Sequence, residues 1–293
     1  METILLLFIK SIALGAVYSM IAIGFSLLWQ TSRTINFAQG EFVTVPAFLM
    51  VLFLHFFKFP FGFALLSSAL LSILLLGLLM KRALVQPLIR EGVIPLVVAT
   101  IALSFLIRES FIVFWTPEAL HFPSVFGKRS LQLGSAVFSV IDFWNIAMAV
   151  IMIYGLHIFI SKTKVGKALQ AVAQDREVAR ILGINVKRMI TLAFMINAVL
   201  VSVSAALIAP VYMVKYDMGV ELGLKAFYAA IIGGFNQTRG ALLGGIIVGL
   251  IETFTAAYIS THYKGAFVLI ILMAIILFKP EGLLGERELY EYR

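Results

Sequence analysis

Two short polar segments between long apolar stretches hold the residues best suited to binding a small charged molecule. The first reads Thr-Ile-Asn-Phe-Ala-Gln-Gly-Glu at residues 34–41. Asn36 can cap a following helix, Gln39 stands at the position of its reciprocal capping partner, and Gly40 allows another backbone to approach closely. The segment is either an ordinary turn that starts the next helix, or a discontinuous helix whose free N–H groups point into a cavity and bind an anion.

The second segment reads Ala-Ala-Ile-Ile-Gly-Gly-Phe-Asn-Gln-Thr-Arg-Gly at residues 229–240. Gly233 or Gly234 can end a short helix, and Asn236 or Thr238 can cap the next one. A glycine-interrupted segment in each half of a chain is typical of transporters built from paired repeats. Irregular backbone at membrane depth is tolerated only where protein buries it or where it lines a water-filled cavity. The two breaks together favour one shared central site.

One acidic residue joins these segments as a candidate for the solute pathway. Glu252 lies deep within an apolar stretch, where an unpaired charge costs roughly 2.5–3.5 kcal/mol or more, so it is either paired structurally or part of the pathway. Lys10 and Arg108 lie near enough to the ends of apolar stretches to reach the membrane surface. We expect a valine at Gly233 or Gly234 to stop transport while leaving assembly intact. The predicted pathway residues are Asn36, Phe37, Gln39, Gly40, Glu41, Gly233, Gly234, Asn236, Gln237 and Glu252.

Residue types that carry covalent, metal or nucleotide chemistry are missing or scattered. The chain has no cysteine, which excludes disulfides, thiolate metal sites and cysteine nucleophiles. Its histidines lie near the ends of apolar stretches without metal-ligand spacing, at His55, His121, His157 and His262. The sequence contains neither a P-loop nor a Gly-x-Ser-x-Gly elbow, so we expect no cofactor, no metal and no enzymatic activity of its own.

The composition requires a membrane around most of these residues. Of the 293 residues, 61% are hydrophobic and only 13% are charged, about half the charged fraction of a soluble domain. The apolar blocks are about 20 residues long, the length that a helix needs to cross the hydrocarbon core. We therefore predict an all-α, polytopic helical bundle in which residues 1–293 form a single transmembrane domain. The expected spans are residues 4–29, 42–57, 61–80, 93–115, 142–161, 190–214, 240–259 and 264–279, with a shorter, non-crossing helix at 224–233.

The distribution of charge predicts the orientation of the bundle. The net charge of +8 is concentrated in the loops at residues 81–92 and 162–190, which marks their side as cytoplasmic and places the N-terminus outside. The side of the tail after Pro280 depends on whether the short helix crosses or turns back. The outer loop at residues 116–141 alternates on each side of Gly134-Ser135, which predicts a short hairpin that covers the outer mouth or docks a partner.

Two further patterns predict contacts between helices. Residues 165–183 should form a mixed polar and apolar helix that ends at Gly183. It lies either on lipid or in a groove of another protein, and its small apolar residues favour protein docking. The pairs Gly240–Gly244 and Gly245–Gly249 allow close helix packing, within this subunit or at a dimer seam.

These motifs occur together in one known family. Asn36–Glu41 resembles the Asn-Phe-Ala-His-Gly-Glu signature of branched-chain amino acid ABC permeases, with Gln39 in place of histidine. Residues 166–185 look like that family's ATPase-coupling loop, residues 223–249 like its glycine-rich segment, and Pro280–Gly285 like its terminal motif. The resemblance covers nearly the whole chain in order.

The resemblance implies a type II-like ABC importer permease in the bacterial inner membrane. It implies a second permease subunit, as a copy or a paralogue, two cytoplasmic ATP-binding subunits that use the ATP, and an extracellular solute-binding protein. Leucine, isoleucine and valine are the family's default substrates, while relatives move urea, amides or other amino acids. The expected ATPase-coupling residues are Ala168, Val172, Asp175, Arg176, Ala179, Leu182 and Gly183.

The main alternative is an ion-coupled secondary transporter of small polar or zwitterionic solutes, since broken helices and paired repeats suit that class equally. Its intramembrane carboxylate would be Glu252 or Glu41. The segment at 165–183 discriminates between the two, because a secondary transporter has no ATPase to dock. A membrane scaffold without transport would need neither helix break.

Overall fold

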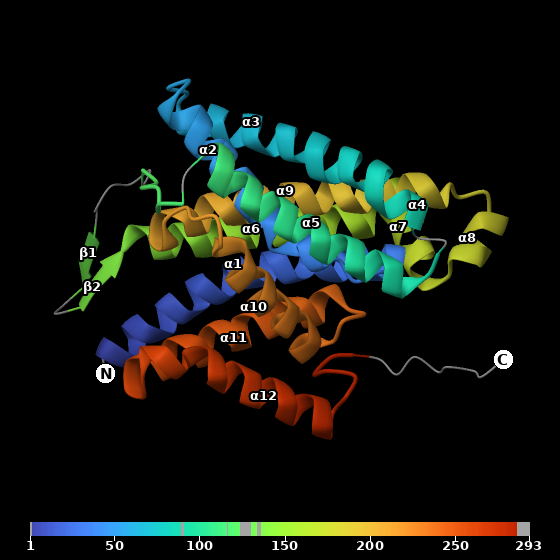
Figure 1. Ribbon diagram of the computed structural model, residues 1–293. Helices are drawn as coiled ribbons and strands as arrows, with labels where there is room; N and C mark the ends of the chain where they lie inside the picture. Colours follow the sequence, from blue (N-terminus) through green and yellow to red (C-terminus); the bar gives the residue numbers. More distant parts are fainter. Residues whose placement is uncertain (1, 89–90, 116, 124–129, 134–135, 286–293) are drawn as a thin grey trace.

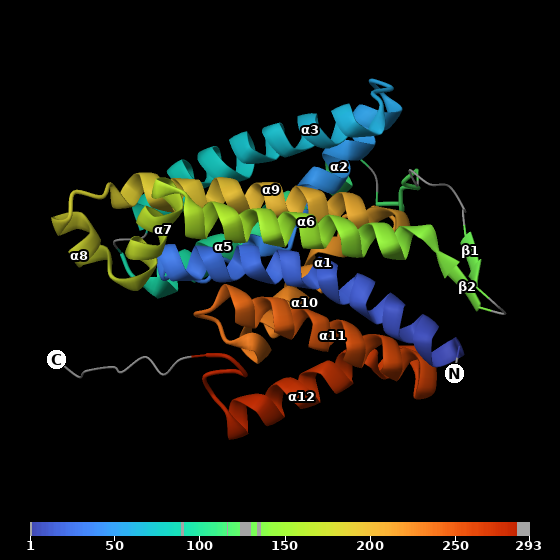
Figure 2. The same cartoon turned by 180° about the vertical axis from the view of Figure 1, so that it is seen from behind.

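The computed structural model describes residues 2–88, 91–115, 117–123, 130–133 and 136–285. Long helices run roughly side by side through an elongated bundle (Figures 1 and 2). Eight of them are long and apolar enough to cross a membrane, as the sequence predicted. These are Glu2–Ser32, Phe37–His55, Phe61–Leu88, Val93–Phe114, Val140–Lys162, Val186–Tyr212, Thr238–Tyr258 and Thr261–Phe278.

The first four spans consist of α1 (Glu2–Ser32), the 3-10 turn η1 (Phe37–Gln39) with α2 (Glu41–His55), the continuous run α3 (Phe61–Ser72), η2 (Ile73–Val85) and α4 (Gln86–Leu88), and α5 (Val93–Phe114). The middle of the chain forms β1 (Ser130–Leu133), β2 (Ala136–Ser139), α6 (Val140–Lys162), α7 (Lys164–Gln174) and α8 (Arg176–Ile181). The last part forms α9 (Val186–Tyr212), α10 (Met218–Gly233), α11 (Thr238–Tyr258), η3 (Thr261–Tyr263) and α12 (Lys264–Phe278).

Helix α1 packs at the centre of the bundle, where small residues let other backbones come close. A Cβ atom placed on Gly249 of α11 would lie 2.5 Å from the backbone nitrogen of Gly15 in α1. Gly245 meets Ser19 of α1 in the same way, while Gly240 and Gly244 face the backbone of α10. The predicted glycine pairs thus serve packing within the subunit.

The predicted outer hairpin is present at the N-terminal end of the bundle (Figure 1). Strands β1 and β2 pair antiparallel, with Ser130 opposite Ser139. The predicted turn at Gly134-Ser135 lies outside the described residues. The loop that precedes the hairpin is fixed to the segment after α9, because Leu120 and Val214 exchange backbone hydrogen bonds of 2.8 and 3.0 Å.

The short helix begins earlier than predicted but does turn back. Helix α10 covers Met218–Gly233, stops at Gly234 with φ of +112°, and is followed by α11 running in the opposite direction. The N–H groups of Leu283 and Leu284 donate to the last two carbonyl groups of α10 at 2.9 Å. The segment after α12 therefore lies against the α10–α11 turn, on the side of α7 and α8.

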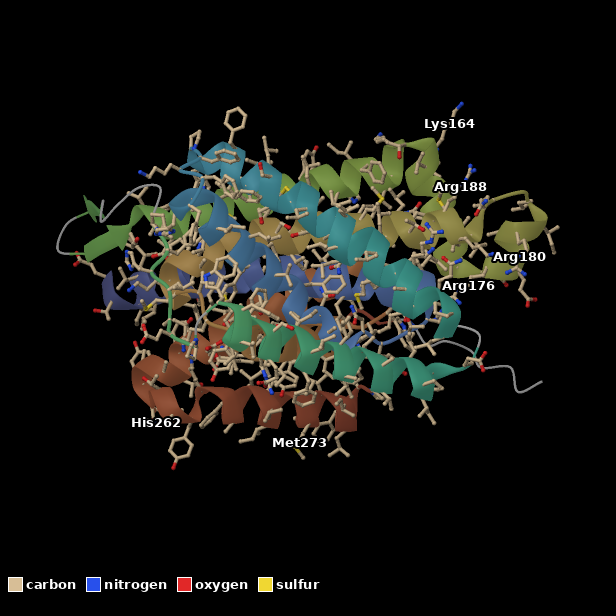
Figure 3. All side chains as sticks on the ribbon, turned by 45° about the horizontal axis from the view of Figure 1, so that its top comes forward. Lys164, Arg176, Arg180, Arg188, His262 and Met273 are labelled. Atoms are coloured by element: carbon tan, nitrogen blue, oxygen red, sulfur yellow. The ribbon has the colours of Figure 1, made fainter. Side chains whose placement is uncertain are left out.

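Basic side chains gather at that end of the bundle. Figure 3 shows Lys164, Arg176, Arg180 and Arg188 together around α7, α8 and the start of α9. The opposite end carries the start of α1 and the hairpin (Figure 2). The positive-inside rule predicts that the α7–α8 end is cytoplasmic.

This orientation can be tested with single cysteines, because the chain contains none. In intact cells we expect a membrane-impermeant maleimide to label Lys58→Cys, in the exposed loop between α2 and α3. Lys164→Cys and Leu284→Cys should react only after the membrane is permeabilised. Labelling of Leu284→Cys without permeabilisation, with Lys164→Cys protected, would show that α10 crosses.

The packing of α11 on α1 predicts a large effect of one glycine substitution. Gly249→Val should lower the free energy of unfolding by about 1–3 kcal/mol or more, because the new side chain overlaps backbone that cannot move aside. Gly155→Val in α6 is the matched control, since a Cβ atom there meets nothing within 4 Å. Thermal unfolding in detergent should separate the two variants, and equal stability would contradict this packing.

Candidate functional site

Helix α2 begins inside the bundle rather than at its end. After α1 ends at Ser32, the chain runs back without regular structure to η1. The N–H group of Phe37 donates to Thr100 Oγ1 of α5 at 3.2 Å, and Gln39 reaches Asn197 in the middle of α9. A start within the bundle fits the discontinuous helix better than an ordinary turn at the membrane surface.

Gln39 forms a reciprocal amide pair with Asn197. Each side chain donates an N–H to the other's carbonyl oxygen at 2.9 Å, and both residues are buried. Asn36 caps η1 as predicted by accepting from the N–H of Ala38 at 3.1 Å, but Gln39 does not return to Asn36. That half of the predicted capping pair was wrong, because the Gln39 amide finds its partner on a distant helix.

Gly40 permits the close backbone contact that the sequence predicted, and the contacting element is α10. A Cβ atom on Gly223 would lie 2.7 Å from the Cα atom of Gly40. A Cβ atom on Gly219 would overlap both the backbone of Gly40 and the hydroxyl of Thr44. The start of α2 and the first turns of α10 are therefore fixed against each other by backbone contact.

A cavity of about 270 Å³ opens at this junction, between α2, α5 and α10. The five predicted residues of the first segment line it, which are Asn36, Phe37, Gln39, Gly40 and Glu41. Most of its remaining wall is apolar, formed by Phe25, Ile101, Phe105, Val220, Leu224 and Phe227. It has the mixture of apolar surface and few polar groups that characterises small-molecule sites.

Two polar residues of the cavity, Ser104 and Arg108 of α5, were missed by the sequence analysis. The signal for Arg108 was present, namely a charge within an apolar stretch, but it was interpreted as a side chain that reaches the membrane surface. Ser104 Oγ donates to Glu41 Oε1 at 3.1 Å. Glu41 is fully buried, and its Oε2 has no hydrogen-bond partner among the described residues.

The second break opens toward a different cavity. Asn236 Oδ1 accepts from Trp29 Nε1 at 2.9 Å, and the residue that precedes α11 is Gln237. The predicted cap by Asn236 or Thr238 was therefore wrong. Gln237 lines a cavity of about 670 Å³ beside α6 and α7. Aromatic rings lie between the two breaks, because the Phe227 ring centroid is 6.1 Å from that of Phe37 at the first break and 5.9 Å from that of Phe235 at the second.

Gly233 and Gly234 serve the fold at the turn rather than lining the α2 cavity. A Cβ atom on Gly233 would overlap the carbonyl group of Gly240, and one on Gly234 would lie 2.5 Å from the backbone nitrogen of Gly285. A valine at either position would disturb the turn itself. From this geometry we expect such a variant to assemble poorly, in place of the normal assembly expected from the sequence.

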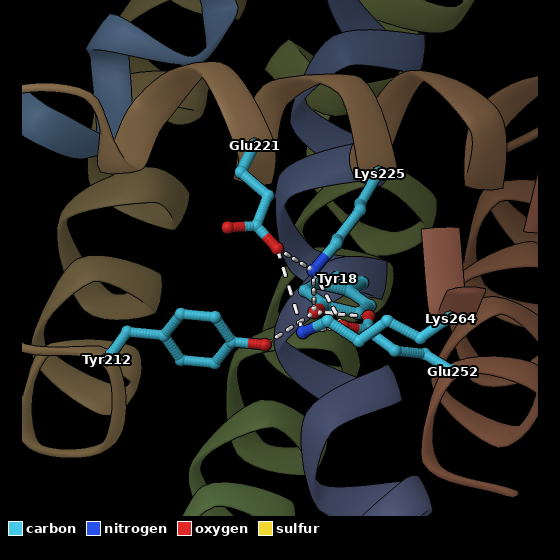
Figure 4. A network of polar contacts seen from close by, with 6 residues as sticks. All are labelled: Tyr18, Tyr212, Glu221, Lys225, Glu252 and Lys264. Carbon is cyan, nitrogen blue, oxygen red and sulfur yellow. Dashed lines mark hydrogen bonds and ion pairs between the residues drawn. The ribbon is translucent and has the colours of Figure 1, made fainter. Parts of the chain in front are cut away.

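Glu252 lies in a buried network of charged and phenolic groups (Figure 4). It accepts from Lys225 Nζ at 2.7 Å, Lys264 Nζ at 2.8 Å and Tyr18 Oη at 2.8 Å. Lys225 also contacts Glu221 at 2.5 Å, and the hydroxyl groups of Tyr18 and Tyr212 lie 3.2 Å apart.

The network links helices α1, α9, α10, α11 and α12. Its two acids and two ammonium groups balance, so the buried charges are compensated. Glu252 is thus paired, and it does not line the α2 cavity. Within the described residues, no group of three or more acidic or histidine side chains could hold a metal ion.

The predicted cytoplasmic helix consists of two helices, so the expectation of one continuous helix was wrong. The Asp175 carboxylate accepts from the N–H groups of Glu177 and Val178 at 2.7 and 2.9 Å. An aspartate that caps the following turn interrupts the helix before it. Gly183, with φ of +82°, terminates α8 as predicted.

The apolar residues predicted for this segment do not form one continuous face, because some are buried and others are exposed. Val172 and Ala179 are buried, whereas Leu182 is 72% exposed and the neighbouring Ile181 is 84% exposed. Ala168 is half-buried. Arg176 Nε and Nη2 are buried without a hydrogen-bond partner among the described residues. Burial lowers the pKa of this guanidinium, and the charge of Arg33 lowers it further.

Known proteins resemble this chain along almost its full length. Residues 7–276 match the family described as "Branched-chain amino acid transport system / permease component". The high-affinity branched-chain amino acid transport system permease protein BraD of Pseudomonas aeruginosa is 29% identical over 96% of this chain and 95% of its own.

Two further relatives extend the same similarity. The permease protein LivH of the Escherichia coli high-affinity branched-chain amino acid transport system is 28% identical over 95% of this chain and 94% of its own. The probable permease protein LivH of Methanocaldococcus jannaschii is 28% identical over 91% of this chain and 88% of its own. No solved structure matches the chain. The eight spans and the family match together show that this multi-pass membrane protein belongs to the family of permease components of branched-chain amino acid transport systems.

Proposed function

We propose that this permease moves leucine, isoleucine or valine across the bacterial inner membrane as one subunit of an ATP-driven importer. The cavity at the start of α2 carries the proposal. It combines apolar walls with one acid and one guanidinium, and it is lined by the segment that resembles the family signature. An amino acid with an apolar side chain matches that combination, with no covalent step.

Cytoplasmic partners supply the ATP hydrolysis in this proposal. The sequence has no P-loop, and the family is that of a permease component. At the basic end of the bundle, Val178, Ile181 and Leu182 expose apolar side chains. Exposed apolar groups at a water-facing end are typical of a protein interface.

A second permease subunit would complete the pathway. The open side of the cavity is rimmed by Phe105 and Leu224, which are 52% and 45% exposed. Helix α5 as a whole is among the least buried spans. A copy or a paralogue against this face would close the cavity laterally, while an extracellular solute-binding protein would deliver the amino acid at the hairpin end.

The ion-coupled alternative loses one of its two candidate carboxylates. Glu252 is bound by two lysines and a tyrosine, so it has little capacity to exchange a cation during transport. The family match also favours the ATP-driven class. Glu41 remains as the acid that either mechanism would use.

Reconstitution tests the proposed function directly. The chain, purified with its partners and placed in proteoliposomes with internal ATP, should take up radiolabelled leucine only when the solute-binding protein is outside. Two ATP-binding subunits should co-purify, as identified by mass spectrometry. Uptake by the chain alone, driven by an ion gradient, would replace this proposal with the secondary transporter.

The exposed tip of α8 predicts a coupling variant. Leu182→Glu should leave folding unchanged, because the side chain is 72% exposed, yet reduce ATP-driven uptake and co-purification of the ATPase by roughly tenfold, as for a charge placed in an apolar contact. Ile259→Glu is the matched control, since Ile259 is 58% exposed beyond the far end of α11. Equal uptake in the two variants would exclude α8 as the docking element.

A further inference from the structure

We propose that the cavity at the start of α2 binds its substrate as a zwitterion, with the ammonium group at Glu41 and the carboxylate at Arg108. The apolar side chain of the substrate would lie against Phe25, Phe37 and Phe227. This assignment rests on the proposed function and makes it more specific, because it states which end of the amino acid each residue recognises.

Glu41 supplies the site for the ammonium group. Its side chain is fully buried, lines the cavity, and uses one oxygen to accept from Ser104. The other oxygen has no hydrogen-bond partner in the described part of the chain. Buried carboxylate oxygens are normally satisfied, so an unpaired oxygen on a residue that lines a cavity is suited to a donor that arrives with the ligand. The lysine nearest in sequence to the cavity wall is engaged elsewhere, since Lys225 is bound to Glu221 and Glu252.

Arg108 supplies the site for the carboxylate. It lines the same cavity and its side chain is 26% exposed. Its Nε and Nη2 atoms both approach a single oxygen of Glu109, at 3.4 and 3.3 Å, and Glu109 is 58% exposed. These contacts are long and share one acceptor oxygen, so the pair is weak and a substrate carboxylate can replace it. The guanidinium carbon lies 4.8 Å from the centroid of the Phe105 ring, which helps to hold the planar group in place.

The electrostatics of the first helix break favour this orientation of the substrate. Glu41 occupies the first turn of α2, where the helix dipole attracts a negative charge. The helix N-terminus is thus already matched by the protein's own acid, and the substrate carboxylate is left to Arg108. This reverses the sequence-based expectation that the N–H groups near Asn36 hold the substrate anion.

The remaining wall selects for size and an apolar side chain. The volume of about 270 Å³ is near the lower limit of small-molecule sites, roughly 300 Å³, which suits a single amino acid. The rings of Phe25, Phe37 and Phe227 form one aromatic surface. The centroids of the Phe25 and Phe37 rings lie 5.6 and 6.1 Å from the centroid of the Phe227 ring. Urea or a simple amide would leave both the carboxylate and the guanidinium without an opposite charge, so the site favours an amino acid over these alternatives.

A single cysteine in the cavity tests binding without the solute-binding protein. Leu224 lines the cavity and is 45% exposed, so Leu224→Cys in the purified transport complex should react with a small thiol reagent. Leucine should slow that reaction. 4-Methylpentanoic acid, which lacks the ammonium group, and leucine methyl ester, which lacks the carboxylate, should slow it less at equal concentration. Lack of protection by leucine, because the thiol is unreactive or because its rate is unchanged, would overturn the proposal.

Charge-neutral variants then assign the two ends of the substrate. In the Leu224→Cys background, Glu41→Gln should remove the difference between leucine and 4-methylpentanoic acid. Arg108→Gln should remove the difference between leucine and its methyl ester. A purely structural effect would reduce the protection of the cysteine by all three compounds alike, and that result would contradict the assignment.

Transport separates failure of this assignment from failure of the proposed function. Glu41→Gln and Arg108→Gln should each lower leucine uptake by about tenfold or more, the loss expected for one charged hydrogen bond. The controls Glu91→Gln and Lys58→Gln remove the same charges at exposed positions outside the cavity and should transport normally. No uptake by the unsubstituted complex would refute the function, whereas normal uptake by all four variants would refute only the zwitterion site.

Discussion

Helix α10 ends in buried backbone, since Ile232, Gly233 and Gly234 are all buried, and the carbonyl groups at its end need partners within the protein. The C-terminal segment meets this requirement, because Leu283 and Leu284 donate to the last two carbonyl groups of α10. Gly234 allows the chain to turn with a positive φ, and it leaves room for the backbone at Gly282 and Gly285. The glycines of the terminal motif thus have a physical role in closing the end of a half-helix. Without that closure the last carbonyl groups of α10 would be buried and unpaired.

The two faces of α10 have different roles: one packs against α2 beside the cavity, and the other binds the charged network. Gly219 and Gly223 face α2, whereas Glu221 and Lys225 face the charged network. Residues two positions apart on a helix point to nearly opposite sides, so the spacing alone separates the pairs. The network joins α10 to α1, α11 and α12 through Tyr18, Glu252 and Lys264. Removing one partner would leave a buried charge unpaired, at a cost of about 3–5 kcal/mol, so the network helps to fix α10 in the bundle.

The sequence predicted those features that depend on local composition. Eight spans follow from apolar blocks of membrane length, and the glycine pairs of α11 follow from their spacing. It could not predict which distant side chains meet. Gln39 and Asn197 are 158 residues apart, so a capping partner close in sequence was the natural but wrong choice for Gln39. Asp175 was placed inside one continuous helix because the apolar periodicity runs through it. Periodicity does not show that a side chain can cap the next turn and so interrupt the helix. Arg108 was assigned to the membrane surface because the sequence does not show that a cavity lies beside it.

The two helix breaks also differ in a way that their similar glycine content concealed. At the first, the helix N-terminus, the acid in its first turn and the guanidinium of α5 surround one cavity. At the second, Asn236 is held by Trp29 and the start of α11 faces another cavity. A broken helix therefore does not by itself create a binding site, since the groups opposite its end decide what can bind. The first break has an acid with one unpaired oxygen opposite a weakly paired arginine, and the second has a backbone turn closed by glycines. Because the first site has few polar contacts, its affinity for an amino acid should be modest. Modest affinity suits a pathway that must release its substrate and leaves tight capture to a separate binding protein.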